Sequence, residues 1–349
     1  MDFDSHVEEL PFAHGGQIGS GQIKERAENF RVNETLTFEP SGEGEHVFLY
    51  IQKTDLNTGD VTKILSKHAD VTRHSVAYAG MKDRRAVSKQ WFSVQLPGKE
   101  GTDWNALNND QILIESVTRH AKKLKRGTIK HNQFEILISN MSVDNEKLEQ
   151  KALNIENKGV PNYFMRQRFG YQCQNLSRTF DFFIKKEPIR NKKLRGIFLS
   201  SARSFLFNKV LAQRVNEGVW DKAIQGDAFM LNGTRQCFYG ADISSEIHKR
   251  MLEHDISATG PLFGVNKDMV QYNAQDIEQN VFSMNDVFCD GLRRQKMETS
   301  RRALRVIPEG FKYDLVADDA LRLSFKLPSG SYATAVIREL IDVSENSAQ

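Results

Sequence analysis

Residues 76–92, VAYAGMKDRRAVSKQWF, place a charged centre between two apolar ends. The pattern predicts a short strand over 75–79, a break at the glycine that follows it, and a second strand that starts at Trp91. The charged centre, Lys82–Arg85, is then a loop on which one carboxylate stands among three cations. Loops positioned by rigid strands often carry chemistry, and nearby cations favour the ionised form of a carboxylate. Asp83 is therefore either a nucleophile or an ordinary turn residue that pairs with a neighbouring arginine on the surface.

The composition bounds the class of protein. At 349 residues the chain is long for one domain, and its 39% hydrophobic and 27% charged residues are ordinary for a soluble globular protein. The formal net charge of +3 does not by itself predict a nucleic-acid binder. The start of the chain is acidic, and no apolar run approaches the roughly 18 residues of a membrane span, so we expect a cytoplasmic protein without a membrane partner. The three cysteines are far apart and odd in number, which favours free thiols, and the histidines include no H-E-x-x-H motif, so we expect neither a metal nor a cofactor.

The periodicity of apolar residues predicts strands first, then a largely helical block, then a return to strands. The pair over 30–34 and 47–51 reads as a hairpin with a longer loop. Further strands are predicted over 91–96, 111–117, 134–138 and 321–327, and helices over 58–68, 144–158, 200–216, 244–254, 274–282 and 332–341. Pro261–Gly264 reads as a loop, and the Gly159-Val-Pro-Asn break marks a domain boundary.

The most basic segment lies between two of the predicted strands. No acidic residue occurs from Ser116 through Phe134, whereas the segment contains Arg119, Lys122, Lys123, Lys125, Arg126 and Lys130. Such a run binds phosphates by displacing counterions, or it is merely a solvated face. Asn132 offers an amide donor and acceptor to a base edge, and Phe134 offers a ring on which an unpaired base stacks.

Several stretches, in order along the chain, together resemble one known family. They are Phe30-x-Val-x-Glu34, Gly42-Glu-Gly-Glu-His46, Gly80-Met-Lys-Asp-Arg-Arg-Ala-Val-Ser-Lys-Gln90, Asn132-x-Phe134, Gly159-Val-Pro-Asn-Tyr-Phe164, Gln167-Arg-Phe-Gly170, Ser204-x-x-x-Asn208, Leu327-Pro-x-Gly-Ser-Tyr-Ala-Thr334 and Arg338-Glu339. This set resembles the signature of the tRNA pseudouridine synthase D (TruD) family. One departure is Met165, which stands where the family pattern has a glycine.

The resemblance implies roles for particular residues. Asp83 corresponds to the catalytic nucleophile of the family, and Lys24 is implied to lie near it. Phe30, Asn132, Phe134 and Tyr332 are implied to contact the substrate, although Phe30 by composition alone reads as a core residue. Arg84 joins the cations of the basic segment as an expected contact of the RNA backbone, and Arg338 pairs either with Asp83 or a phosphate, or with Glu339.

The resemblance also implies an overall plan. We expect an α+β enzyme with a split catalytic domain, residues 1–157 and 307–349, that holds a large, mainly antiparallel mixed sheet. A mostly helical α/β domain, residues 158–306, is inserted into it. The implied activity is isomerisation of uridine to pseudouridine at position 13 of tRNA, in the D-arm, with tRNA as partner and no obligate protein partner evident.

Three alternatives stay open at the level of the sequence. Asp83 attacks either the ribose C1′ or uracil C6, and the residues do not choose between them. A non-catalytic RNA-binding protein would use the same basic cleft without needing Asp83. A carboxylate enzyme acting on a sugar would need a second carboxylate, and none is apparent near Asp83 in the sequence.

Overall fold

The computed structural model describes residues 3–98, 101–186, 189–240, 242–266 and 269–345. These form two compact units. We call residues 18–148, 308–330 and 341 onward the sheet unit, and residues up to 17, 149–307 and 331–340 the helical unit. Within the described ranges no helix has both the length and the apolar character needed to cross a membrane.

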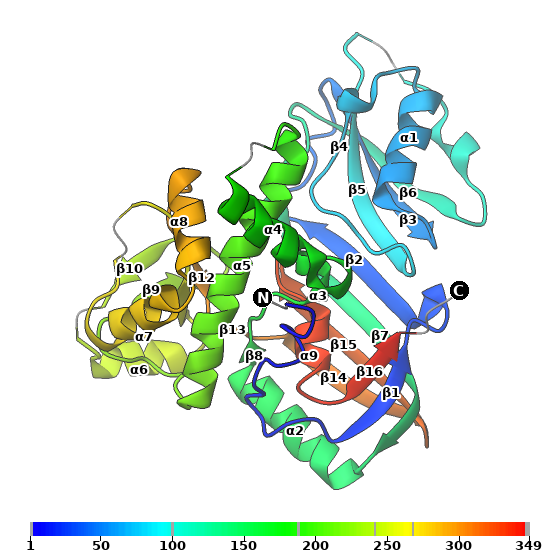
Figure 1. Cartoon of the computed structure of the whole chain (residues 1–349). Helices are drawn as coiled ribbons and strands as arrows, with labels where there is room; N and C mark the ends of the chain where they lie inside the picture. The colour runs from blue at the N-terminus through cyan, green and yellow to red at the C-terminus, as the bar shows by residue number, and fades with distance from the viewer. Residues whose placement is uncertain (1–2, 99–100, 187–188, 241, 267–268, 346–349) are drawn as a thin grey trace. The chain divides into compact units, whose positions relative to one another are not determined.

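A mixed sheet of ten strands dominates the sheet unit (Figure 1). Its main path runs β14 (Glu309–Ala317), β15 (Ala320–Pro328), β7 (Ile129–Val143), β2 (Phe30–Leu36), β5 (Val87–Gln95), β3 (His46–Thr54) and β6 (Ile112–His120). Off this path, β1 (Gly19–Ile23) pairs with β7 and with β16 (Asp342–Glu345), and β4 (Val76–Tyr78) pairs with β5. Among the strands that the structure describes in this sheet, only β2–β5 and β1–β16 are parallel pairs, so the prediction of a mainly antiparallel mixed sheet is confirmed.

Apolar side chains pack on both faces of this sheet. In β2 the residues Phe30, Val32, Glu34 and Leu36 are buried, while the residues between them are more exposed. Helix α1 (Thr58–His68) packs through Val61 and Leu65 on one face of β3 and β5, and Phe48 of β3 belongs to a separate cluster on the other face. Buried polar side chains accompany these apolar ones, and two of them, Lys53 of β3 and Gln90 of β5, bond to the Asp83 loop.

Two of the sequence predictions about strands are wrong. The strands over 30–34 and 47–51 do not form a hairpin, because β5 lies between β2 and β3, parallel to β2 and antiparallel to β3. The strand expected to start at Trp91 starts at Val87, since the polar residues before the tryptophan already form the ladder with both neighbours. The helices predicted over 58–68 and 144–158 are confirmed as α1 and α2 (Asn145–Lys158).

The helical unit is built around the long helix α5 (Lys192–Asn216), which extends the helix predicted over 200–216. Its buried residues pack against α4 (Gln174–Lys185), α7 (Tyr272–Ser283) and α8 (Asp286–Arg294). A four-stranded antiparallel sheet completes the unit, in the order β10 (Cys237–Tyr239), β9 (Ala228–Leu231), β11 (Ile256–Leu262) and β12 (Ser300–Ala303). Pro261 and Leu262 therefore belong to a strand and not to the expected loop, because both pair with β12.

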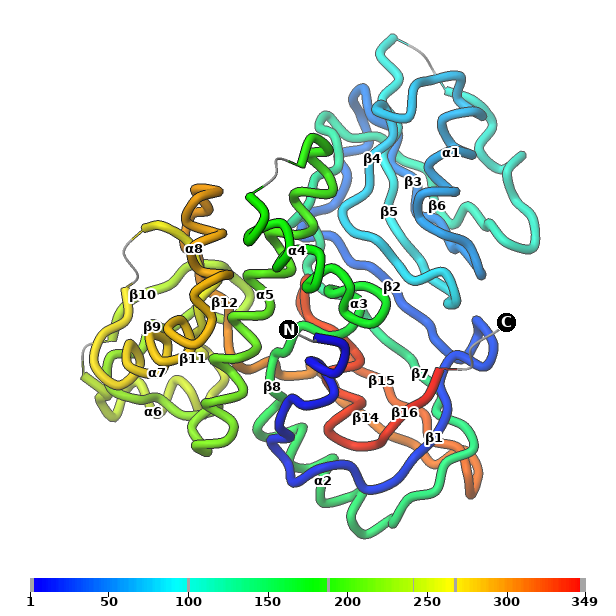
Figure 2. The backbone as a smooth tube through the Cα atoms, viewed as in Figure 1, coloured from blue at the N-terminus to red at the C-terminus, as the bar shows by residue number. Residues whose placement is uncertain are grey.

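Short segments from both ends of the chain also belong to the helical unit. Figure 2 shows the start of the chain, in dark blue, beside the red segment that contains α9 (Ala333–Ile337), which is labelled in Figure 1. Arg338 donates to the carbonyl oxygen of Leu10 at 2.6 Å, and the backbone N–H of Ala13 donates to Glu339 Oε2 at 3.0 Å. Helix α9 is shorter than the predicted 332–341. The expected division into a split catalytic domain and an inserted domain at 158–306 stays a prediction.

Candidate active site

Buried polar side chains of the sheet unit hold the Asp83 loop in place. Gln90 Nε2 donates to the Gly80 carbonyl oxygen at 2.5 Å, and Lys53 Nζ donates to the Asp83 carbonyl oxygen at 2.8 Å. The N–H of the residue before Asp83 donates to Thr58 Oγ1 at 3.0 Å, and that hydroxyl donates to Gln90 Oε1 at 3.1 Å. Because Lys53, Thr58 and Gln90 are all buried, these bonds fix the main chain of the loop against the sheet.

The carboxylate of Asp83 is held on one side and open on the other. Lys24 Nζ lies 3.0 Å from Asp83 Oδ2 and 2.8 Å from Glu345 Oε1. The same ammonium lies 4.8 Å from the centre of the Phe30 ring, a cation–π distance. Asp83 Oδ1 accepts no hydrogen bond from any residue that the structure describes, and the side chain is 41% exposed. One oxygen is thus positioned by Lys24, and the other is available to an incoming group.

Local backbone geometry places Lys24 between the two carboxylates. Strands β1 and β16 run parallel with Ile23 opposite Glu345, so the residue after Ile23 lies next to the Glu345 side chain. Lys24 itself has φ +57°, a left-handed conformation that is uncommon for a residue other than glycine. Such a conformation persists only where the surrounding structure enforces it. At Lys24 the surroundings do so by burying 95% of the side chain.

Burial acts on the pKa of both lysines that contact Asp83, with opposite net results. Burial alone lowers the pKa of Lys24, but the carboxylates of Asp83 and Glu345 outweigh it, and the pKa is raised. Burial lowers the pKa of Lys53 to about 8, because the more distant Asp83 charge compensates only in part. Lys24 is therefore a permanent cation at neutral pH, whereas Lys53 titrates in the mildly alkaline range.

Asn132 is oriented by a neighbouring lysine. Lys82 Nζ lies 2.6 Å from Asn132 Oδ1 and 3.4 Å from Glu34 Oε1. An ammonium only donates, so the oxygen of Asn132 must face Lys82 and its NH₂ group points elsewhere. Glu34 Oε2 in turn accepts from the N–H of Trp91 at 3.2 Å, and burial raises the pKa of Glu34 despite the nearby ammonium. The NH₂ group of Asn132 is thereby left to donate to a carbonyl oxygen such as those of uracil.

The two predicted substrate-contacting phenylalanines lie in the packed face of the sheet. Phe30 and Phe134 meet edge to face with ring centres 6.2 Å apart, and Phe134 packs on Phe325 at 5.6 Å. Phe134 is only 8% exposed, so little of its ring is open to a base. Their roles in substrate binding stay predictions.

The predicted phosphate-binding cations lie on the surface of the sheet unit. Lys122, Lys125 and Arg126 are exposed in the connection between β6 and β7, and Lys130 is exposed at the start of β7. Lys123 is half-buried, and its ammonium donates to the His74 carbonyl oxygen. Arg84 is exposed, and its Nε lies 3.5 Å from Asp55 Oδ1. If Asp83 were an ordinary turn residue, it was expected to pair with a neighbouring arginine, but Arg84 pairs with Asp55 instead.

Tyr332 and Arg338 belong to the helical unit. Tyr332 is half-buried, and its ring lies edge to face with Phe164 at 6.1 Å. Arg338 is buried and pairs with Glu339 at 3.3 Å, which is the ion pair that the sequence offered as its alternative. The proposed contact of the Tyr332 ring with a flipped base stays a prediction.

Sequence reasoning missed Glu345, Lys53 and Glu34 as parts of the site. Glu345 lies 321 positions after Lys24, and only the parallel pairing of β1 with β16 brings them together. Lys53 and Glu34 lie at buried positions of strands β3 and β2. The only sequence pattern that could have predicted their burial is that they alternate with apolar residues. The second carboxylate that was not apparent in the sequence is therefore present, bound to the same lysine as Asp83.

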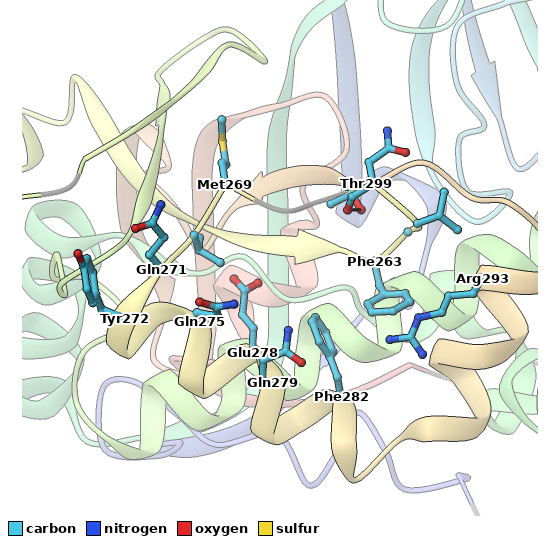
Figure 3. Close-up of a pocket in the computed structure, with 14 residues that line it drawn as sticks. Phe263, Met269, Gln271, Tyr272, Gln275, Glu278, Gln279, Phe282, Arg293 and Thr299 are labelled. Atoms are coloured by element: carbon cyan, nitrogen blue, oxygen red, sulfur yellow. Dashed lines mark hydrogen bonds between the residues drawn. The ribbon is translucent and has the colours of Figure 1, made fainter.

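A separate cavity of about 690 Å³ lies in the helical unit (Figure 3). Three glutamines at four-residue spacing, Gln271, Gln275 and Gln279, line it from α7 and the residue before it. Phe263 and Phe282 pack edge to face in its wall with ring centres 4.7 Å apart. None of the residues that line it is one of the site residues predicted from the sequence. This cavity and the Asp83 site are therefore distinct features.

Comparisons with known proteins agree on one family. The model of "tRNA pseudouridine synthase D (TruD)" matches residues 11–187 and 189–340. The tRNA pseudouridine synthase D of Methylococcus capsulatus is 40% identical over 335 residues, which cover 96% of this chain and 95% of that protein. The protein of the same name from Aeromonas hydrophila is 38% identical over 339 residues, covering 97% and 96%. A crystal structure from Methanosarcina mazei, described as TruD, shares the fold with a TM-score of 0.71 at 21% identity over 96% of each chain.

Proposed function

The chain belongs to the tRNA pseudouridine synthase D (TruD) family, and from this membership we propose that it isomerises uridine to pseudouridine at position 13 of tRNA, in the D-arm. The observation that carries the proposal is the Asp83 carboxylate on its fixed loop, with one oxygen on Lys24 and the other open. A half-exposed carboxylate positioned by a buried ammonium is suited to nucleophilic attack.

The reaction starts with a base that must leave its stack. A uridine within folded RNA is out of reach of a side chain until it is flipped out. Asp83 then attacks either C1′ of the ribose or C6 of uracil, and the N1–C1′ bond breaks. The uracil rotates and rejoins through C5, so that a C5–C1′ bond forms. The bond to Asp83 then breaks, N1 takes up a proton, and the hydrogen on C5 leaves as a proton. No oxidation, reduction or energy input is needed for this rearrangement.

The residues around Asp83 supply position and charge. Lys24 holds the attacking carboxylate and stabilises negative charge on it when it leaves again. The NH₂ group of Asn132, turned away from Lys82, donates to a uracil carbonyl oxygen and limits how the detached base can turn. Phe30 and Phe134 provide an apolar floor, and Tyr332 is the proposed ring that stacks on the flipped base.

The exposed cations between β6 and β7 suit the backbone of the tRNA. Lys122, Lys125, Arg126 and Lys130 can each neutralise one phosphate, with Lys123 and Arg84 as further contacts. The tRNA substrate supports a cytoplasmic location.

Release of tritium from tRNA carrying [5-³H]uridine tests the proposal directly. Only rejoining through C5 expels this label, so release by the wild type measures isomerisation. Asp83→Asn should lower the single-turnover rate by at least roughly 10⁴-fold, as expected when a nucleophile is removed. Asp55→Asn is the matched control, since Asp55 is an exposed aspartate of the same unit that forms a surface ion pair with Arg84, and its rate should stay within about twofold.

Each outcome points to one interpretation. Release by the wild type and loss in Asp83→Asn, with tRNA binding retained, support the proposal. Binding without release by the wild type would favour the non-catalytic RNA-binding alternative. Full release by Asp83→Asn would keep the activity and remove Asp83 as its nucleophile.

A further inference from the structure

The positive charge of the chain is concentrated in two segments, one in each unit. Residues 119–131 of the sheet unit contain six cations and no acid, a net charge of +6. Residues 185–195 of the helical unit, KKEPIRNKKLR, contain six cations and one acid, a net charge of +5. Since the whole chain carries only +3, all other residues together carry −8. The first segment has a role in the proposed function, and the second has none so far.

The second segment connects the end of α4 to the start of α5 (Figure 1). The two helices pack together, and Thr179 Oγ1 of α4 donates to the Phe198 carbonyl oxygen of α5 at 3.3 Å. We call the six cations of this connection the 185–195 surface; they are Lys185, Lys186, Arg190, Lys192, Lys193 and Arg195, and all are exposed.

Few of these cations are compensated by the protein itself. Lys185 lies 3.9 Å from Asp181, and Arg195 Nε donates to Gln295 at 2.9 Å. Among the residues that the structure describes, the other four make no hydrogen bond or ion pair through their side chains. Exposed cations that lack acidic partners attract counterions, which a polyanion displaces on binding.

The position of two of these lysines opposes the helix dipole. The first turn of α5 begins with Lys192 and Lys193 and contains no acid, although the N-terminus of a helix carries partial positive charge. Helices α6 (Ser245–Leu252) and α8 follow the favourable rule, with an acid in the first turn and cations in the last. Helices α4 and α7 also lack an acid in the first turn, but the first turn of α5 in addition begins with two lysines, whose charges the helix dipole does not favour.

We propose that the 185–195 surface binds phosphates of the tRNA backbone, as a second contact in addition to the basic segment of the sheet unit. The inference rests on the proposed function, because that function supplies a large folded polyanion as substrate. A tRNA has many phosphates beyond those next to the modified uridine, and each bound phosphate adds affinity without reading sequence.

The test compares tRNA binding by the wild type and by a Lys192→Gln/Lys193→Gln double variant over a range of salt concentrations. The control is Lys222→Gln/Lys249→Gln, which removes the same charge from exposed positions elsewhere on the helical unit. Each phosphate contact contributes roughly 0.7–0.9 to the slope of log affinity against log salt, so the double variant should lose roughly 1.5 from that slope. At about 0.1 M salt the affinity should fall roughly tenfold or more, and the control should stay within about twofold.

A second readout separates this role from a structural one. Removal of charges that oppose the helix dipole should leave the melting temperature equal or higher, while tRNA affinity falls. The rate of tritium release at saturating tRNA should stay near the wild-type value, because the Asp83 site is unchanged.

The outcomes distinguish this inference from the proposed function. If the wild type releases tritium but the double variant binds tRNA with unchanged affinity and salt slope, the 185–195 surface does not bind tRNA. Loss of binding to phosphatidylglycerol vesicles in that same variant would assign the surface to a membrane instead. If the wild type releases no tritium from any tRNA, the proposed function itself fails.

Discussion

Two aspartates, one in each unit, are each bound to a buried cation, but they differ in how far their carboxylates are exposed. Asp83 in the sheet unit gives one oxygen to Lys24 and leaves its side chain 41% exposed. Asp227 in the helical unit is fully buried, and both its oxygens are bound by Arg214. Asp227 Oδ2 also accepts from the N–H of Ile224 at 2.9 Å.

The difference separates a carboxylate that can react from one that holds the fold. A buried carboxylate whose two oxygens already accept hydrogen bonds is out of reach of a substrate, and breaking its pair leaves an uncompensated charge in the interior. A pair whose carboxylate is half-exposed contributes less to stability, because water screens it, but it holds a nucleophile in place where a substrate can reach it. Substitution at the two sites should therefore change different properties.

The largest effect on stability is expected at Asp227. Asp227→Asn leaves Arg214 buried without a counter-charge and should lower the free energy of unfolding by about 3–5 kcal/mol. Urea unfolding followed by tryptophan fluorescence measures this, since Trp220 lies buried in the same unit. Asp83→Asn should change the unfolding midpoint little, although it abolishes tritium release.

The control for this substitution is Asp276→Asn, an exposed aspartate on α7. It should leave the midpoint within about 0.5 kcal/mol of the wild type. A stability loss at Asp83 as large as that at Asp227 would remove the distinction drawn between the two pairs.

The next effect is expected on catalysis, at the partner of Asp83. Lys24→Met removes the ammonium that positions Oδ2 and should lower the single-turnover rate of tritium release by roughly 10²-fold, since small displacements of a reacting group cost that much. Lys63→Met is the matched control, because Lys63 also pairs with an aspartate at 3.0 Å, but on the exposed side of α1. Equal rates for the two variants would show that the Lys24 contact does not serve the reaction.

The sequence predicted the elements better than their arrangement. Strict alternation predicted the strands that became β2 and β15, because each has one buried and one more exposed face. The position of β5 between β2 and β3 was not predictable, since parallel pairing joins residues far apart in the chain and leaves no local pattern.

The site was predictable only in part for a related reason. Asp83 stood out by its charged surroundings, and the family resemblance named Lys24 and Asn132. Lys53 and Glu345 were missed, because a lysine in a strand is expected to face water and Glu345 meets Lys24 only through the pairing of β1 with β16. Long-range pairing therefore assembled the part of the site that no motif contained.

A smaller effect on activity, coupled to pH, is expected at Lys53. Lys53→Met removes the bond to the Asp83 carbonyl oxygen and should lower the rate of tritium release roughly tenfold, as expected for loss of a hydrogen bond from a charged donor. The free energy of unfolding should respond in the opposite sense at neutral pH, because folding forces a charged lysine into a buried position.

The sign of the pH dependence follows from the lowered pKa. The folded protein releases the Lys53 proton near pH 8, whereas the unfolded chain keeps it until about pH 10.4. Between these values the unfolded state binds more protons, so the stability of the wild type should rise with pH relative to Lys53→Met. Urea unfolding of both proteins at pH 7 and pH 9.5 measures the difference, and a constant difference would contradict a lowered pKa.

The smallest effect is expected at Glu345, the exposed carboxylate that shares Lys24 with Asp83. Glu345→Gln leaves the ammonium balanced by Asp83 alone, so the pairing tightens and the carboxylate becomes a weaker nucleophile. Because the Glu345 carboxylate is half-exposed and screened by water, we expect its pair with Lys24 to be worth about 0.2–1 kcal/mol, which limits the fall in kcat to roughly fivefold, with KM unchanged. Asp342→Asn on the same strand is the control, since Asp342 is exposed and makes no ion pair with a described residue. A rise in kcat for Glu345→Gln would mean that Glu345 competes with Asp83 for Lys24 and weakens the Lys24–Asp83 contact in the wild type. The contact with Lys24 would then increase the reactivity of Asp83, not reduce it.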